Sequence, residues 1–600
     1  MLIFVAGMAF GQQAKGRLDV TAVPVPSWHY LEEYTLDKPT DIAAWSAQKP
    51  GLNVAFGSTD NRYLRCEVPM LSEGSDTWKD TGWKGERLNA QMVLWSPDTI
   101  EQIRVTAGDL VNANGDVISK ENIKTSLIRY VLSNFPYNAS EFSCEVSNDS
   151  AWLMPDRFEP FERFDLPGNT VRPVWISINI PSGAQPGHYN GQIVVNSLEN
   201  NVTLNVSIQV QHMVLPDPHD WKFRLDLWQN PWVIAWYYHV EPWSEEHKML
   251  LKQHLKIYAE AGGTYITTYA LHSPWSDNSY MIEGTMIDWI KTSRNDWKYD
   301  YTIFDQYVEL AMEMGIDRAI TVYTPLPWGN RFRYLDEKTG NYIYEIWEPT
   351  SEIYKSSWNS FLTDLKEHLM QKGWFEKTYL GINENALEYT MAAINIIKEH
   401  SRDWKITYAG NWHAELSALL DDYSPVIESE GSPAEMKERT ARGQTTTYYV
   451  CCTPPKPNNF VFSPPAESRF IGWYAKAYGY DGFLRWAYDA WPADPVRDAR
   501  HTLWPAGDCY LVYPGGNSSI RFEKLREGIV DYEKIRLLKE VTPKSEDKRV
   551  KSLVEELNTH LNNLASEREY KNRNYDQEFI TGSLQKGKTL IRDISDALGK

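Results

Sequence analysis

The chain has 600 residues, of which 42% are hydrophobic and 24% charged, with a net charge of −19 at pH 7. The chain is too long to fold around a single hydrophobic core, so two to four domains are expected. Its apolar content excludes a disordered chain. The negative charge argues against nucleic acid or an anionic membrane surface as a partner. The 25 Trp and 35 Tyr residues fit large cores, and they also fit a sugar site, because apolar sugar faces stack on aromatic rings.

The N-terminus reads MLIFVAGMAFGQQ, with small residues at Ala9 and Gly11 spaced as at a signal-peptidase site. The apolar run is too short to span a membrane, and it lacks the basic start of a signal peptide. We interpret residues 1–17 as a clipped secretory signal. A secreted, periplasmic or cell-surface protein without a transmembrane segment is therefore expected.

The cysteines are five in number, an odd and sparse set that predicts no disulfide framework. Cys451 and Cys452 are adjacent, so on a strand they point to opposite sides and do not bridge each other. The chain contains neither C-x-x-C nor H-E-x-x-H, so no metal site and no cofactor are expected.

Residues 18–218 show short apolar stretches separated by Pro, Gly and Asn. VWISINIP (174–181) is followed by a turn-rich segment and then by QIVVN, which is typical of a hairpin. TLNVSIQVQHMVL (203–215) alternates in the same way. The pattern predicts an N-terminal β-sandwich.

From residue 219 to 518 the chain repeats a unit of amphipathic helix, Gly break and short apolar strand. In one unit Leu251, Leu255 and Tyr258 share a helix face, and Gly262 and Gly263 end the helix. Eight strands are expected, at 224–228, 265–270, 319–323, 378–382, 405–410, 446–450, 482–488 and 510–514, with 424–428 as an extra or a replacement. This alternation predicts a (β/α)8 barrel.

Residues 519–600 have a helical pattern. Phe522, Leu525, Ile529 and Tyr532 are spaced as one helix face, and Leu553, Leu557, Leu561 and Leu564 as another. We expect a C-terminal helical extension that packs on the barrel.

The candidate site residues follow from the barrel, because active-site groups gather at the C-terminal ends of its strands. Each residue alone fits packing or capping equally well, and only their shared placement favours a site. The candidates for substrate binding are Trp228, Gln229, Tyr269, His272, Tyr323, His413, Tyr448, Arg485, Trp486, Asp489 and Trp491.

The candidate catalytic residues are Asn383 and Glu384, at the end of the strand at 378–382. Adjacent residues face opposite ways on a regular strand, so both enter one site only if the strand ends there and the chain turns. Helix capping by Asn383 or Asn385, with Glu384 in the first helical turn, explains the same residues equally well.

The chain resembles glycoside hydrolase family 123 and its related bacterial catalytic-domain families. The resemblance rests on RLDLWQNPWVIAWYY (224–238), TYLGINEN (378–385), YYVCCTPPKPN (448–458) and FLRWAYDAWPADPVRDARHTLWPAGDCYLVYPG (483–515), continuing into 519–535. It implies a retaining, exo-acting β-N-acetylhexosaminidase that favours terminal N-acetylgalactosamine on an oligosaccharide or glycoconjugate. In such enzymes the substrate's acetamido oxygen attacks the anomeric carbon, an exception to the two-carboxylate pattern.

The family pattern at the site is Asp-Glu, in which the Asp polarises the acetamido group and the Glu is the acid/base. Glu384 matches the acid/base, whereas Asn383 replaces the Asp and offers no negative charge. Losing that charge raises the barrier by roughly 2–4 kcal/mol. Asn385 and Ala386 also depart from the expected Arg-Pro, which favours natural divergence over an engineered change.

Three explanations of Asn383 remain open at this point. An amide suffices, helped by another acid such as Asp226 or Asp489; or the chain acts on a different sugar; or Asn383 is an engineered change. The rivals to a hexosaminidase are a glycosidase that pairs Glu384 with a second carboxylate and a catalytically silent glycan-binding protein.

Overall fold

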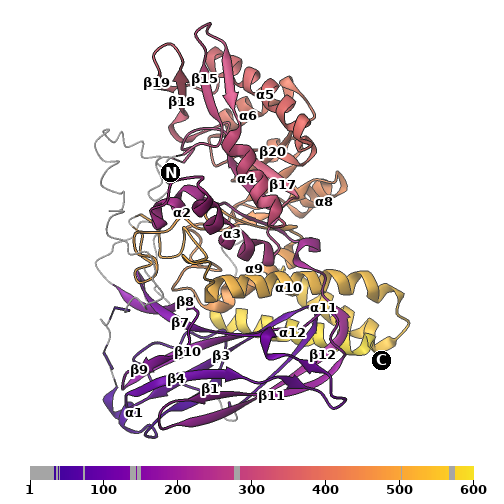
Figure 1. The fold of residues 1–600 in the computed structure, drawn as a ribbon. Coiled ribbons are helices and arrows are strands. Elements are labelled where there is room, and N and C mark those ends of the chain that lie inside the picture. The colour runs from indigo at the N-terminus through magenta and orange to yellow at the C-terminus, as the bar shows by residue number, and fades with distance from the viewer. Residues whose placement is uncertain are drawn as a thin grey trace.

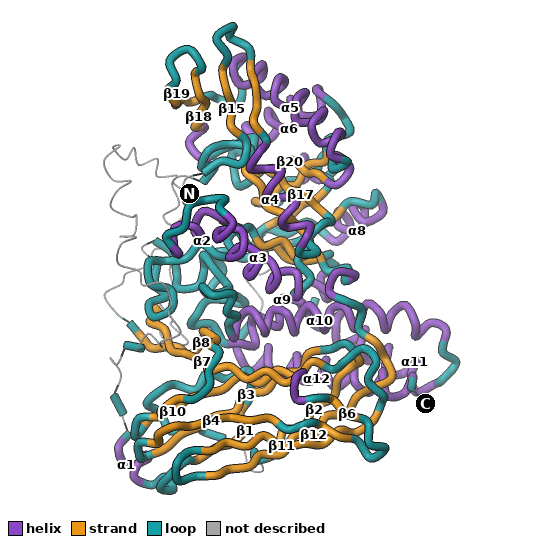
Figure 2. The backbone as a smooth tube through the Cα atoms, viewed as in Figure 1, coloured by secondary structure: helices purple, strands orange, loops and turns teal. Residues whose placement is uncertain are grey.

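The computed structural model describes residues 33–34, 38–39, 41–71, 75–135, 144, 151–275, 284–501, 503–565 and 575–599. The expected signal segment, residues 1–17, lies outside this described part. Figure 1 shows a β-sandwich at the bottom, a barrel of parallel strands above it, and C-terminal helices packed between them. This is the predicted fold class, and Figure 2 shows how the strands divide between sandwich and barrel.

The sandwich consists of two antiparallel-rich sheets with the orders β1-β3-β10-β7-β8 and β2-β12-β11-β4-β9, the second also carrying β5 and β6. Its strands are β1 Asn53–Gly57, β2 Thr77–Lys84, β3 Arg87–Ser96, β4 Ile100–Ala107, β5 Leu110–Val111, β6 Val117–Ile118, β7 Ile123–Ser133, β8 Trp152–Glu159, β9 Phe164–Leu166, β10 Thr170–Asn179, β11 Gly187–Asn196 and β12 Asn201–Val214, after a short helix α1 Ile42–Ser46. The alternation in β12 buries Leu204, Val206 and Ile208 against the facing sheet.

The hairpin predicted between 174–181 and QIVVN is wrong, because β10 and β11 belong to different sheets. β10 pairs with β3 and β7, whereas β11 pairs with β12, with Gly187 opposite Val210. Both strands have the expected apolar pattern, but alternation does not specify the partner. β10 is buried along nearly its whole length, as a central strand between the sandwich core and the helices is.

The barrel is nearly closed and has eight parallel strands. Its strands are β13 Arg224–Leu227, β14 Tyr265–Tyr269, β17 Ala319–Tyr323, β20 Thr378–Ile382, β21 Lys405–Gly410, β22 Asp422–Pro425, the broken strand β23 Thr445–Thr446 and β24 Tyr448–Tyr449, and β25 Gly482–Arg485. Bridges Leu225 to Gly263 and Val426 to Tyr449 join its two hydrogen-bonded sheets. The surrounding helices are α2 Pro231–Tyr238, α3 Glu245–Glu260, α4 Thr302–Glu313, α5 Glu352–Lys372, α6 Leu387–His400, α7 Ala414–Ser417, α8 Pro433–Ala441 and α9 Pro465–Tyr478.

The strand predicted at 510–514 is wrong, and its alternative at 424–428 overlaps the observed β22. Tyr510 and Tyr513 instead lie in a long connection, where they make isolated bridges with Asp489 and Asn517. Every residue from Tyr510 to Tyr513 is buried. A buried loop and a buried strand therefore have the same apolar pattern here.

A mixed sheet is inserted after barrel strands β14 and β17, with β15 and β18 parallel and the other pairs antiparallel. It has the order β16-β15-β18-β19, with β15 Asp288–Lys291, β16 Trp297–Asp300, β18 Arg331–Asp336 and β19 Asn341–Ile346. Both insertions leave the barrel at the C-terminal ends of its strands. The inserted sheet therefore stands at the end of the barrel where active sites form.

The C-terminal helices are α10 Ile520–Val541, α11 Lys548–Leu564 and α12 Gln577–Leu598. The predicted face of α10, including Phe522, Leu525 and Ile529, is buried against the barrel. Helix α12 reaches the sandwich, where the indole N–H of Trp83 donates to Ser595 Oγ at 3.0 Å.

The connection between β25 and α10, residues 486–519, is supported by the sandwich. Leu132 of β7 bridges Asp498, and Arg157 of β8 bridges Ser519. The buried carboxylate of Asp156 also accepts hydrogen bonds from the Tyr513 hydroxyl at 2.8 Å and from Arg521 Nε at 2.9 Å. The sandwich sheet thus continues into a loop of the barrel.

Candidate active site

A cavity of about 150 Å³ opens among the C-terminal ends of the barrel strands. Its walls are mostly apolar, with six aromatic side chains, and contain two carboxylates. The lining residues are Trp228, Trp275, Trp328, Asn383, Glu384, Ala409, Tyr449, Cys451, Cys452, Leu484, Trp486, Trp504 and Asp508. Four of the sequence-predicted residues therefore meet here, namely Trp228, Asn383, Glu384 and Trp486.

Glu384 is exposed at the mouth of this pocket, two residues after β20 ends. Its carboxylate accepts a hydrogen bond from the hydroxyl of Tyr449, a buried residue of β24. The predicted contact Tyr448 lies outside the barrel, where its hydroxyl donates to Ile471 O at 2.8 Å. The choice of Tyr448 was wrong because neighbouring side chains alternate between the two sides of a strand.

Asn383 is buried and ties the end of β20 to the connection after β17. With its amide nitrogen toward Leu326 O (3.0 Å) and Thr324 Oγ1 (2.9 Å), its oxygen accepts from the indole N–H of Trp328 at 2.7 Å. This orientation gives every donor an acceptor, whereas the opposite one sets the amide nitrogen against the indole N–H. Asn383 thus positions Trp328 in the pocket wall.

Helix capping does not explain these residues. Helix α6 begins at Leu387, its N-cap position is Ala386, and no side chain makes a capping hydrogen bond. The side chain of Asn385 donates to Leu326 O at 3.3 Å instead. Both amides therefore hold the neighbouring connection and leave Glu384 at the mouth of the pocket.

Asp508 is the second carboxylate of the pocket, and it was not among the residues predicted from the sequence. It is fully buried, with Oδ1 2.8 Å from Arg485 Nη2 and Oδ2 accepting from Trp486 Nε1 at 3.2 Å. Burial raises its pKa to about 6, against the opposing charge of Arg485. Burial also raises the pKa of the Cys451 thiol to about 12, and the charges of Asp508 and Glu384, which line the same cavity, add to that rise.

Tryptophan rings form the remaining walls. Trp228 stacks on Trp275 with ring centroids 5.0 Å apart and 20° between the planes. Trp486 meets Trp504 edge-on at 6.0 Å. Flat apolar walls with a few polar groups suit a sugar ring, whose faces are apolar and whose edges carry hydroxyls.

Several other predicted residues lie just behind the pocket wall. Tyr323 packs on Trp228 at 4.5 Å, and Tyr269 packs on Trp275 while its hydroxyl donates to Gln229 O at 2.6 Å. The Gln229 side chain joins β13 to β14, because Oε1 accepts from Thr267 N at 2.9 Å. Arg485 holds Asp508, so these residues support the pocket without lining it.

The last group of predicted residues lies farther from the cavity. Trp491 is buried with its indole donating to Val512 O at 2.8 Å, and His413 precedes α7. Asp489 accepts from Asn230 N at 2.8 Å, and burial raises its pKa to about 7. Asp226 lies inside the barrel, where burial raises its pKa well above the usual range. Neither acid lines the pocket, whereas Asp508 lines it together with Glu384.

A disulfide joins Cys144 to Cys452. Cys452 lines the pocket, whereas Cys144 lies in the connection between β7 and β8 of the sandwich. The odd, sparse set of cysteines predicted no disulfide framework, and a single pair separated by 308 positions leaves no spacing pattern in the sequence. The sandwich is therefore covalently linked to the wall of the pocket.

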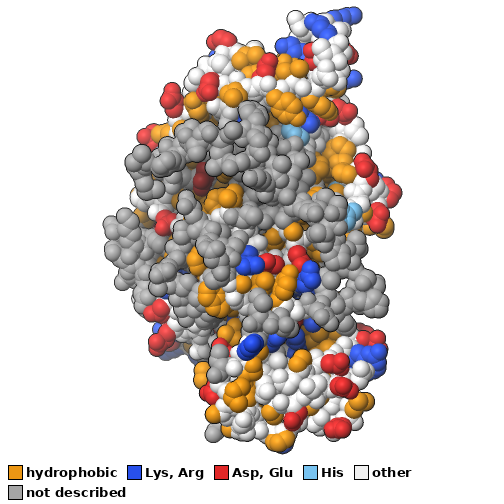
Figure 3. Space-filling model, turned by 90° about the vertical axis from the view of Figure 1, so that its left-hand side faces the viewer, with side chains coloured by type: hydrophobic (Ala, Val, Ile, Leu, Met, Phe, Trp, Pro, Cys, Tyr) orange, Lys and Arg blue, Asp and Glu red, His pale blue; other side chains and the backbone are white. Residues whose placement is uncertain are grey.

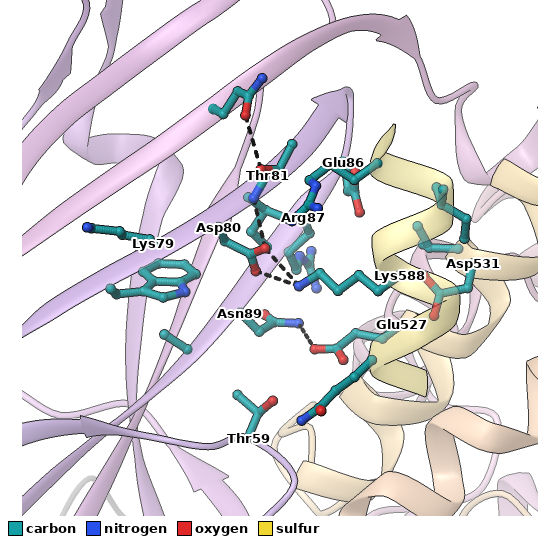
Figure 4. Close-up of a pocket in the computed structure, with 18 of the residues that line it drawn as sticks. Thr59, Lys79, Asp80, Thr81, Glu86, Arg87, Asn89, Glu527, Asp531 and Lys588 are labelled. Carbon is teal, nitrogen blue, oxygen red and sulfur yellow. Dashed lines mark hydrogen bonds and ion pairs between the residues drawn. The ribbon is translucent and has the colours of Figure 1, made fainter. Parts of the chain in front are cut away.

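A larger cavity of about 760 Å³ lies between the sandwich and the C-terminal helices (Figure 4). Its charged groups meet partners across the gap, since Lys588 lies 2.7 Å from Asp80, and Asn89 donates to Glu527 at 3.0 Å. Paired charges of this kind hold two parts of a protein together. The aromatic pocket at the strand ends is the better candidate active site.

Comparison with known families agrees with this geometry. The catalytic-domain model of glycoside hydrolase family 123 matches residues 228–538, and the N-terminal-domain model of the same family matches residues 56–197. The chain is thus a glycoside hydrolase by fold and by sequence. It belongs to glycoside hydrolase family 123.

Solved structures include a family 123 glycoside hydrolase from Clostridium perfringens, described for glycolipid glycan hydrolysis. It is 28% identical with a TM-score of 0.80, over 91% of this chain and 99% of that one. A GH10 xylanase from termite gut is 9% identical, with a TM-score of 0.32 over 60% of this chain and 90% of that one. The Parabacteroides merdae β-glucuronidase is 10% identical, with a TM-score of 0.28 over 74% of this chain and 50% of that one. A comparison with curated proteins gives no match.

Proposed function

We propose that the chain is a retaining β-N-acetylhexosaminidase that removes terminal β-linked N-acetylgalactosamine by substrate-assisted catalysis. The observation that carries the proposal is Glu384, placed at the mouth of a small aromatic pocket and held by the Tyr449 hydroxyl. A cavity of about 150 Å³ suits one sugar ring and not a chain of them, which fits an exo-acting enzyme.

Glu384 supplies the proton in this mechanism. The acetamido oxygen of the bound sugar attacks the anomeric carbon while the glycosidic bond breaks, and Glu384 protonates the leaving oxygen. Glu384 then takes a proton from the water that opens the oxazolinium ion. Two displacements at one carbon retain its configuration.

Asp508 supplies the negative charge that Asn383 lacks. Asn383 is engaged with Leu326, Thr324 and Trp328, so it shapes the pocket and adds no charge. Asp508 is the remaining carboxylate that lines the cavity in the described part of the chain. A fixed anion in a dry site stabilises a developing cation by roughly 2–4 kcal/mol, so Asp508→Asn is expected to lower kcat by about 30- to 1000-fold.

Glycolipid glycans are the proposed source of the terminal sugar. The Clostridium perfringens relative, which is described for glycolipid glycan hydrolysis, matches this chain over 91% of its length.

We also propose a secreted or periplasmic location. The disulfide between Cys144 and Cys452 supports it, because such bonds persist in oxidising compartments. None of the helices in the described part of the chain combines the length and the hydrophobicity of a transmembrane span.

The test is hydrolysis of 4-nitrophenyl β-N-acetylgalactosaminide, beside the N-acetylglucosaminide and the plain β-galactoside. We expect the N-acetylgalactosaminide to be the best substrate and Glu384→Gln to abolish turnover. Preference for the plain galactoside overturns the substrate-assisted mechanism. No turnover of any of the three, with retained sugar binding, indicates a silent glycan-binding protein.

A second candidate keeps Glu384 and uses Asp508 as a protein nucleophile. The observation in its favour is that two carboxylates face one pocket. It predicts a covalent glycosyl-enzyme on Asp508, which mass spectrometry detects after reaction with a 2-fluoro glycoside. Inhibition by an N-acetylgalactosamine thiazoline, a mimic of the oxazolinium ion, favours the first mechanism.

A further inference from the structure

The inserted sheet presents an aromatic surface beside the pocket. In β19, Tyr342, Tyr344 and Ile346 point to one side with 45%, 65% and 68% of their surfaces exposed. β19 is an edge strand of its sheet in the described part of the chain. We call these three residues the rim stripe.

The opposite face of the same sheet is packed. Phe332 and Tyr334 of β18 are buried, and Phe332 stacks on Trp347 at 4.4 Å. The sheet therefore has its own apolar core, and the rim stripe is additional to it. Two tyrosines and an isoleucine left exposed on a face that packing does not need indicate a binding surface.

The rim stripe begins close to the pocket. Ile346 pairs with Arg331, only three residues beyond Trp328, which lines the cavity. Three residues span at most about 11 Å. From Ile346 to Tyr342 the stripe then runs about 13 Å along the strand.

The stripe also faces the end of the barrel. The ring of Tyr344 meets that of His272, which follows β14, at a centroid distance of 6.4 Å. Arg333 lies between the tyrosines on the same face, 4.1 Å above the Tyr342 ring. In the upper part of the face shown in Figure 3, hydrophobic side chains lie beside basic ones and a histidine.

We propose that the rim stripe binds the sugar units that follow the terminal residue on the other side of the scissile bond. This proposal rests on the proposed function, because a pocket that holds one ring forces the rest of the glycan out over its rim. Tyrosine rings stack on the apolar faces of sugars, and arginine and histidine donate hydrogen bonds to hydroxyls. The continuous path from Trp328 to Tyr342 gives this part of the glycan a surface of matching chemistry.

The experiment compares two substrates of one enzyme. One is 4-nitrophenyl β-N-acetylgalactosaminide, which has no further sugar, and the other is a trisaccharide with β-linked N-acetylgalactosamine on lactose. Tyr344→Ala is expected to raise KM for the trisaccharide about tenfold, which corresponds to about 1.4 kcal/mol, and to leave the nitrophenyl glycoside unchanged. Tyr344→Phe keeps the ring and is expected to behave as the parent.

Met370→Ala is the matched control. Met370 is 62% exposed on α5 and belongs to no part of the rim stripe, so both substrates are expected to react as with the parent protein. Equal loss on both substrates with Tyr344→Ala, or no loss on either, overturns the proposal. Loss only when the trisaccharide is attached to ceramide in micelles assigns the stripe to lipid and also overturns it.

Binding separates this proposal from the failure of the proposed function. Calorimetry with the trisaccharide is run on Glu384→Gln and on Glu384→Gln combined with Tyr344→Ala. The second protein is expected to bind about tenfold more weakly. Equal affinity of the two, or no binding by either, overturns the rim stripe whether or not the parent protein turns over substrate.

Discussion

Asn383→Asp restores the residue expected from the family pattern, and we predict that it destabilises the barrel. The amide nitrogen donates to Leu326 O at 3.0 Å and to Thr324 Oγ1 at 2.9 Å. The threonine hydroxyl can turn and donate to a carboxylate, but the carbonyl oxygen of Leu326 cannot. One buried hydrogen bond is replaced by an oxygen–oxygen contact, so the free energy of unfolding falls by about 1–3 kcal/mol.

The loss of stability in Asn383→Asp depends on pH. Burial and the Leu326 carbonyl disfavour the ionised form, so the pKa of the new carboxyl in the folded protein lies above its unfolded value of about 3.9. A group whose pKa is raised on folding makes its full contribution to the stability of the protein below the unfolded pKa. That contribution is lost as the pH rises through the folded pKa. The difference from the parent is therefore smallest near pH 4, where the protonated carboxyl donates to Leu326 O, and largest near pH 8.

The assay is thermal unfolding of both proteins at pH 4, 6 and 8, with Asn411→Asp as the control. Asn411 is exposed just after β21, so the same added charge there is expected to change stability by less than about 0.5 kcal/mol. Asn383→Asp is expected to lower Tm by roughly 1–5 °C at pH 8. A Tm at pH 8 equal to or above that of the parent refutes the hydrogen-bond assignment, as does a difference that does not grow with pH.

Three further predictions concern the pocket. Tyr449→Phe removes the hydrogen bond that orients Glu384, so kcat is expected to fall about 10- to 150-fold, and an unchanged kcat contradicts this role. Because the pKa of Asp508 is raised to about 6 and its charged form is the active one, kcat/KM is expected to fall tenfold per pH unit below about 6. That decline should be absent in the residual activity of Asp508→Asn. Thiol titration of the unfolded chain should find three free thiols before reduction and five after, and five from the start excludes the bond between Cys144 and Cys452.

The barrel was predictable because its strands and helices have local signals. The face formed by Leu251, Leu255 and Tyr258 is buried as its spacing indicates, and Gly262 adopts the positive φ of 82° that ends such a helix unit. Glu384 was predictable for the same reason, since it follows a buried strand and active sites gather at strand ends. The local sequence pattern was therefore sufficient for features that a single helix or strand determines.

The remaining features depend on contacts between distant segments. Asp508 lies more than twenty residues beyond β25 in the connection to α10, and only the folded path of this connection brings it into the pocket that Glu384 lines. Tyr448 and Tyr449 are chemically alike, and the register of a two-residue strand decides which one enters the pocket. Cys144 and Cys452 likewise carry no local sign of their pairing.

The contacts of β7 and β8 with residues 486–519 bear on how this enzyme can be divided. The two family models match separate parts of the chain, residues 228–538 and 56–197, which suggests that each part can be exchanged or produced alone. Yet the segment that carries Asp508 is held by main-chain bridges from Leu132 and Arg157, and the wall near Cys452 is tied to Cys144. A chimaera with a foreign sandwich keeps Glu384 but leaves the pocket wall that contains Asp508 and Cys452 without its support. The sequence divides into two family domains, but both domains build the pocket. A barrel transferred to another protein therefore has to carry β7 and β8 with it.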